Sequence, residues 1–256
     1  MLRTFFTILL GILLSTKCLA QISPPGLGKA NTAFWFAIGL NQNINKKDNI
    51  SSTTYFGLGR ISRPDNYNLF NKQALYVINE EIAHRFKKNW KYSFALSYRW
   101  QNKYKATPPY EFDVPKARQE LRFYSRFSYL NSFRRLNYSF SYRPEIRFFY
   151  NPDFSTTTKN TQFRSRLRGK VSFNLNSLNT HKIITTTELL FSTTHMSHWS
   201  KFEYQEVRFC LYYSVLFPKQ KIELNIGYMN DLIGKSFITD VNYLAFDIVI
   251  KNPFEK

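Results

Sequence analysis

The stretch "TQFRSRLRGKVSF" (161–173) constrains the fold more than any other, because its residues alternate between two kinds of side chain. A repeat of two residues is the spacing of a β-strand, whose successive side chains point to opposite faces. The stretch therefore predicts a strand with a cationic ladder on one face and a mostly apolar face opposite. The cationic face carries Arg164, Arg166, Arg168 and Lys170, and the other face carries Phe163, Leu167, Val171 and Phe173.

Similar alternation recurs along most of the chain and divides it into eleven strand-like segments. They lie at about 33–43, 51–61, 72–86, 91–101, 117–130, 134–150, 161–174, 182–193, 201–217, 221–230 and 237–250. The faces of 72–86 are not assignable from the pattern. Tight turns such as "KKNW" alternate with longer polar connections such as "NKYKATPPYEFDVPK". This order of turns is typical of an up-and-down meander, which in outer-membrane barrels has short turns at one end and long loops at the other.

Segment length separates the two architectures that explain such alternation. A soluble exported β-sandwich, which would be extracted without detergent, uses strands of about 5–6 residues, whereas a tilted transmembrane strand needs roughly 9–11. The segments here have ten to seventeen residues. We therefore predict an all-β, up-and-down antiparallel transmembrane β-barrel. Because bacterial single-chain barrels have even strand numbers, we expect 10 or 12 strands, with either one strand missed near the N-terminus or one segment in 33–61 outside the wall.

The first twenty residues have the features of a secretory signal peptide. A cation at Arg3 precedes an apolar run from Phe5 to Leu14, and a small residue stands at Ala20, which predicts cleavage before Gln21. A membrane anchor and a lipoprotein site at Cys18 are the alternatives. The predicted organisation is a signal peptide (1–20), an N-terminal lead (21–32) and a barrel domain (33–256), located in the outer membrane of a Gram-negative bacterium.

The polar faces of several segments carry arginine and glutamate, which a barrel would direct into its lumen and away from lipid. These residues are predicted to form either a salt-bridge network that fills a narrow barrel, or the lining of an anion-selective pore or phosphate-ligand site. The predicted lumen-lining set is Arg118, Glu120, Arg122, Arg126, Arg143, Glu145, Arg147, Arg164, Arg166, Arg168, Lys170, Glu188, Glu206 and Arg208.

A formal net charge of +19 also places cations outside the lumen. Lysines cluster near strand ends, where they suit lipid phosphates or lipopolysaccharide, or form a merely solvated rim. They are Lys46, Lys47, Lys87, Lys88, Lys91, Lys103 and Lys105. No nucleic-acid partner is expected for an exported chain whose cations alternate with membrane-type aromatic residues. We expect a monomer, with other envelope proteins as the alternative partners.

One constellation offers an enzymatic alternative. His195 and Ser197 form a His-x-Ser pair with Glu206 downstream, which resembles the catalytic set of outer-membrane lipid A 3-O-deacylases. There a base activates serine and an acid orients the base. Two histidines of a surface loop, His195 and His198, are the plainer interpretation. No metal site and no cofactor are expected.

The order of several strand motifs resembles the uncharacterised DUF2490 family of outer-membrane proteins, common in Bacteroidetes-type bacteria. The stretches that carry the resemblance are "QELRFYSRFSY", "YRPEIRFFY", "TQFRSRLRGKVSF", "TELLFS", "FEYQEVRFCLYY" and "IELNIGYM", within about 33–250. The resemblance implies an outer-membrane barrel and no established activity. The leading functional prediction is a non-enzymatic envelope role, as a structural barrel, a narrow anion-preferring pore or a membrane subunit of a larger assembly. The alternative is the lipid-modifying hydrolase.

Overall fold

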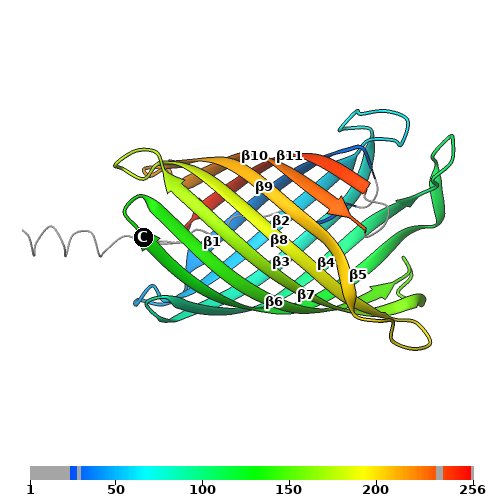
Figure 1. Cartoon of the computed structure of the whole chain (residues 1–256), viewed down its shortest axis with the longest axis horizontal. Helices are drawn as coiled ribbons and strands as arrows, with labels where there is room; N and C mark the ends of the chain where they lie inside the picture. Colours follow the sequence, from blue (N-terminus) through cyan, green and yellow to red (C-terminus); the bar gives the residue numbers. More distant parts are fainter. Residues whose placement is uncertain (1–23, 28–29, 235–238, 255–256) are drawn as a thin grey trace, which may run out of the picture.

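The computed structural model describes residues 24–27, 30–234 and 239–254, which form one closed β-barrel (Figure 1). The predicted signal peptide lies outside the described residues. The strands are β1 (Thr32–Asn43), β2 (Ile50–Ile61), β3 (Lys72–Lys87), β4 (Trp90–Tyr104), β5 (Phe112–Phe133), β6 (Leu136–Tyr150), β7 (Thr156–Asn174), β8 (His181–His195), β9 (Glu203–Phe217), β10 (Ile222–Ile233) and β11 (Thr239–Lys251). All are long enough to cross a bilayer when tilted.

The predicted number of 10 or 12 strands is wrong, because the described barrel has eleven. The two segments of 33–61 are both wall strands, β1 and β2, and the described residues contain no strand beyond the eleven predicted segments. In an up-and-down barrel with an odd number of strands, the first and last strands run in the same direction. The barrel therefore closes by a parallel pairing of β1 with β11, in which Thr32 lies opposite Asn242 and Asn41 opposite Lys251. All other neighbours pair antiparallel.

The two ends of the barrel differ in the length of their connections. At one end, which we call the short-turn end, the turns comprise 44–49, 88–89, 134–135, 175–180 and 218–221, and β11 also ends there. The long-loop end carries connections 62–71, 105–111, 151–155 and 196–202, and β1 begins there. The predicted alternation of short turns with longer loops thus holds, although β5 and β7 extend further toward the long-loop end than expected.

The outer face of the barrel is apolar and rich in aromatic residues. Side chains at alternate positions remain exposed, including Phe94 at 63%, Phe140 at 56%, Ile78 at 52% and Ile226 at 51%. In a water-soluble sheet such residues would face the core. Here the opposite face of every strand is the buried one, so the wall has an apolar exterior and a largely polar interior.

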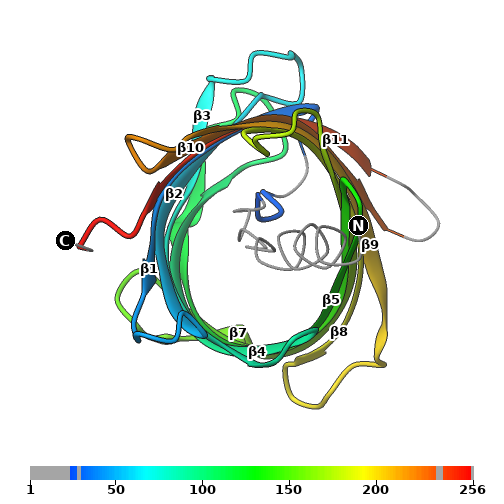
Figure 2. The same ribbon diagram turned by 90° about the vertical axis from the view of Figure 1, so that its left-hand side faces the viewer.

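One side of the lumen, along β1, β2, β10 and β11, is lined largely by small, apolar and aromatic side chains with a few carboxylates on β10 and β11, and the N-terminal lead packs there. Leu27 is 3% exposed, and its backbone N–H donates to the Tyr243 hydroxyl at 3.0 Å. A Cβ built on Gly59 would lie 2.5 Å from a Leu27 methyl, so only glycine allows this approach. Figure 2 shows this short blue segment inside the ring of strands. The lead therefore fills part of the lumen.

Candidate functional site

The other side of the lumen holds a buried network of arginine and glutamate side chains. Every charged residue of the predicted lumen-lining set lies at an inward position of β5 to β9. Register explains why opposite charges meet, since it places Arg164 opposite Glu145 and Arg168 opposite Glu188. Because cross-strand neighbours lie about 5 Å apart, long side chains of opposite charge reach each other.

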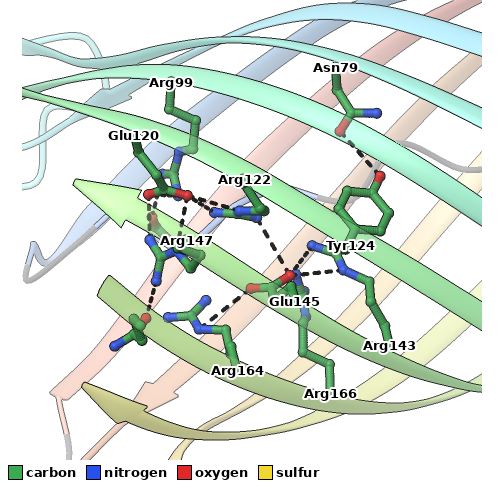
Figure 3. A network of polar contacts seen from close by, with 12 residues as sticks. Asn79, Arg99, Glu120, Arg122, Tyr124, Arg143, Glu145, Arg147, Arg164 and Arg166 are labelled. Carbon is green, nitrogen blue, oxygen red and sulfur yellow. Dashed lines mark hydrogen bonds and ion pairs between the residues drawn. The ribbon is translucent and has the colours of Figure 1, made fainter. Parts of the chain in front are cut away.

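Glu120 on β5 is the first centre of this network (Figure 3). Its carboxylate lies 2.6 Å from Nη2 of Arg122 and 2.5 Å from Nη2 of Arg147. A third guanidinium, that of Arg99 on β4, lies at 3.5 Å. The Glu120 side chain is only 2% exposed. One carboxylate thus joins β5 and β6 through charge-assisted hydrogen bonds, which are the stronger kind, and reaches β4 through an ion pair.

Glu145 on β6 is the second centre, and its side chain has no exposed surface. Nη2 of Arg143 donates to its Oε2 at 2.6 Å, and Arg122, Arg164 and Arg166 lie at 3.8, 3.6 and 3.7 Å from its two oxygens. Figure 3 shows these guanidinium groups converging on Glu145 from three strands, β5, β6 and β7. A buried carboxylate in this setting depends on its cations, and they depend on it.

The network continues across β7, β8 and β9 to β10. Glu188 binds Arg166 and lies 4.0 Å from Nη1 of Arg208. Arg208 also bonds to Glu206, and its Nε lies 3.4 Å from Asp231. The chain of contacts therefore runs around the inner wall from β4 to β10 and links strands that are far apart in the sequence.

The lead meets this network from the lumen side. Nη2 of Arg99 donates to the backbone oxygen of Gly26 at 3.3 Å. On another wall, a Cβ built on Gly26 would lie 2.6 Å from Nη2 of Arg208. The backbone of the lead is thus held between arginines of β4 and β9. Together they occupy the lumen at this level.

The sequence prediction omitted several inward charges. They are Glu81 on β3, Arg99 on β4, Glu223 and Asp231 on β10 and Asp247 on β11. The alternation in "IELNIGYMND" carries a usable signal for β10, because Glu223, Asn225 and Asp231 share one face there. Glu81 carries no such signal, because it adjoins a second glutamate, Glu80.

The three catalytic candidates do not form one site. Glu206 is buried in the lumen and bonds to Arg208. His195 ends β8 at an outward position, where Nδ1 lies 3.2 Å from the Asn160 side-chain oxygen. Ser197 lies in the following loop, and its Oγ is 3.0 Å from Nδ1 of His198 rather than bonded to His195. Because Glu206 lies inside the wall, it cannot orient the imidazole of His195, which lies outside. The geometry of a serine–histidine–acid set is therefore not present in these three residues.

Within the residues that the structure describes, no group of three or more His, Cys, Asp or Glu side chains is arranged to hold a metal ion. In the same residues, no helix is long and apolar enough to span a membrane.

Comparison with known protein families places this chain. The family model described as a protein of unknown function, DUF2490, matches residues 32–238, which spans β1 to β10. The chain belongs to the DUF2490 family. No curated protein matches it. The match covers every strand that contributes to the arginine–glutamate network, β4 to β10.

Proposed function

We propose that this DUF2490 protein is an outer-membrane β-barrel with a non-enzymatic envelope role, and that its own side chains and its lead keep the lumen closed. A single observation carries the proposal: the barrel wall is apolar outside and charged inside. Fully buried charges such as Glu145 face the lumen, while phenylalanines such as Phe94 and Phe140 are exposed. Such a wall suits a barrel surrounded by lipid.

The contents of the lumen favour a closed barrel over an open pore. Ions would have to pass Glu120 and Glu145, whose side chains are at most 2% exposed because guanidinium groups surround them. The lead at Gly26 occupies space between Arg99 and Arg208 at the same level. A barrel of eleven strands is also narrow enough for long side chains to fill much of its interior.

The connections support an orientation in the membrane. Short turns face the periplasm in outer-membrane barrels and long loops face outward. In this orientation the C-terminus lies on the periplasmic side. Of the lysines expected to contact lipid phosphates or lipopolysaccharide, Lys103 and Lys105 lie at the long-loop end, and Lys46, Lys47, Lys87 and Lys88 lie at the short-turn end.

Planar-bilayer conductance of the refolded protein tests the closed lumen. We expect no conductance steps from protein whose folding is shown by heat-modifiable migration on gels. Anion-selective steps that weaken in Arg164→Ala, Arg166→Ala or Arg168→Ala variants would contradict the proposal and make the ladder a pore lining. Extraction of the protein from cells without detergent would contradict the membrane location, because it would identify a soluble barrel.

A further inference from the structure

The lumen contains a cavity of about 60 Å³ on the short-turn side of the network centres. Its walls come from β2, β3 and β5 to β8, and Pro24 and Pro25 of the lead cover one side. Toward the short-turn end, the inward positions of β5 to β7 include small residues such as Ser128, Ser141 and Ser172. These side chains are shorter than the arginines of the network.

The charges around the cavity are unbalanced. Five arginines but only two glutamates line it: Arg122, Arg126, Arg143, Arg166 and Arg168 against Glu81 and Glu188. Glu145, in the lumen beside the cavity, contacts three of these arginines, and Glu120 binds Arg122. Five cations against four carboxylates still leave an excess of positive charge. The cavity is therefore suited to an anion.

Hydrogen bonding points the same way. Among the groups that line the cavity, buried nitrogens without a hydrogen-bond acceptor are Nε and Nη2 of Arg168, Nε of Arg166 and Nδ2 of Asn79. Buried donors are nearly always paired in folded proteins. These donors come from two strands, β7 and β3, on different walls of the cavity. What they lack is an acceptor.

The carboxylates of the cavity already have donors, which excludes a cation as the natural occupant. Oε1 of Glu81 accepts from Ser93 at 2.6 Å, and its Oε2 lies 2.9 Å from the Tyr124 hydroxyl and 3.3 Å from Nη2 of Arg126. Oε2 of Glu188 is bound by Arg166, and its Oε1 lies 4.0 Å from Nε of Arg168, an ion pair that is too long for a hydrogen bond. The Glu81 oxygens and Oε2 of Glu188 thus have donors while these nitrogens lack an acceptor, which points to an oxyanion as the missing partner.

We propose that this cavity binds a tetrahedral oxyanion of the size of phosphate, through Arg168, Arg166 and Asn79. The planar guanidinium fork matches the paired oxygens of such an anion. A volume of about 60 Å³ holds roughly two water molecules, which suits a small anion and not a nucleotide or sugar. The anion is either free or the terminal group of a ligand that extends toward the short-turn end.

The test is isothermal titration calorimetry of the refolded, detergent-solubilised protein with inorganic phosphate at low ionic strength. We expect saturable binding with one site per chain. Arg168→Gln should weaken it about tenfold or more, the usual effect of losing a charge-assisted hydrogen bond. Asn79→Asp should weaken it as well, because it keeps the oxygen that faces Tyr124 but replaces the unpaired donor with a charge that repels anions.

Arg118→Gln is the matched control. It removes the same charge from the same lumen, but Arg118 lies toward the long-loop end, where it bonds to Gln101. The phosphate affinity of Arg118→Gln should stay within about threefold of that of the parent protein, because this variant changes only the long-range electrostatic potential of the lumen. If Arg168→Gln does not fold, as judged by heat-modifiable migration, Asn79→Asp decides.

A parallel titration with glycerol phosphate separates the two sources of the anion. Equal or tighter binding of the ester identifies the terminal group of a larger ligand, and binding of phosphate alone identifies a free ion; both support the site. No saturable binding of phosphate, or equal losses in Arg118→Gln and Arg168→Gln, would overturn the proposal. The binding test is independent of the conductance test. Phosphate binding can be absent from a closed barrel, and it can be present in a barrel that conducts.

Discussion

Glu145 provides the sharpest test of whether the buried network stabilises the barrel. Its side chain has no exposed surface, and four guanidinium groups lie within 4 Å of its carboxylate, the nearest being that of Arg143 at 2.6 Å. The replacement Glu145→Gln keeps the shape and one acceptor oxygen but removes the negative charge. Four cations, of which Arg122 and Arg166 are buried, then lose their shared counter-charge.

The expected loss is large because the removed partner is fully buried. Breaking a buried ion pair from one side costs about 3–5 kcal/mol, since the remaining charge is left uncompensated. That is a considerable part of the roughly 5–15 kcal/mol by which folded domains are stable. We expect Glu145→Gln to lower the free energy of unfolding in lipid vesicles by about 3–5 kcal/mol, measured by urea titration with tryptophan fluorescence.

Two further variants separate this effect from the general loss of a carboxylate. Glu111→Gln makes the same change at an exposed position of the connection between β4 and β5, and it should alter stability by less than about 0.5 kcal/mol. Adding Arg143→Gln to Glu145→Gln should restore part of the loss, because one uncompensated cation is removed with its partner. A loss from Glu145→Gln no larger than that from Glu111→Gln would refute the reasoning.

Two other substitutions test the interior packing and the outer face. A Cβ at Gly57 would lie 2.3 Å from the Trp35 ring, so Gly57→Ala should lower the free energy of unfolding by about 1–3 kcal/mol, whereas Gly169→Ala, with nothing within 4 Å, should have little effect in the same urea titration. Ile78→Lys places a cation in the middle of the outer face and should cost about 2–4 kcal/mol in vesicles if that face contacts lipid, while Leu178→Lys, in an exposed turn, should be neutral. Equal effects within either pair would contradict the corresponding argument.

The alternation of side chains was sufficient to predict the wall strands and the faces of most of them. On β7, the run Arg164-x-Arg166-x-Arg168 allows one orientation, because the opposite face of 161–173 carries no charge. On β3 the pattern fails, since Glu80 points outward and Glu81 inward. Glu80 is tolerated on the outer face because the Ser52 and Thr54 hydroxyls on β2 donate to it. These contacts depend on the register between β2 and β3, which cannot be read from the sequence of either strand alone.

The centres of the network were not predictable for a related reason. The sequence indicates that Glu120 and Glu145 share the inward face with many arginines, but not which arginines they bind. Arg99 on β4 lies directly opposite Glu120, and Arg164 on β7 lies directly opposite Glu145, because of the register between neighbouring strands, which no single segment reveals. The placement of the catalytic candidates was not predictable either, since spacing along the chain does not reveal that Glu206 and His195 lie on opposite faces of the wall.

The odd strand number and the unequal halves of the lumen have a common explanation. With eleven strands, β1 starts at the long-loop end, opposite to the end where β11 finishes. A chain whose lead lies in the lumen, as residues 24–27 do, must run along the inside of the wall to reach that start. On this side of the lumen the Leu27 side chain packs against Gly59, where a Cβ would lie 2.5 Å from a Leu27 methyl, and the Tyr243 hydroxyl accepts from the Leu27 N–H. An even barrel would bring both chain ends to the same rim and would need no such route. The parallel closure and the buried lead are therefore parts of one arrangement, in which residues 24–27 lie between the apolar side of the lumen and the arginines of the network.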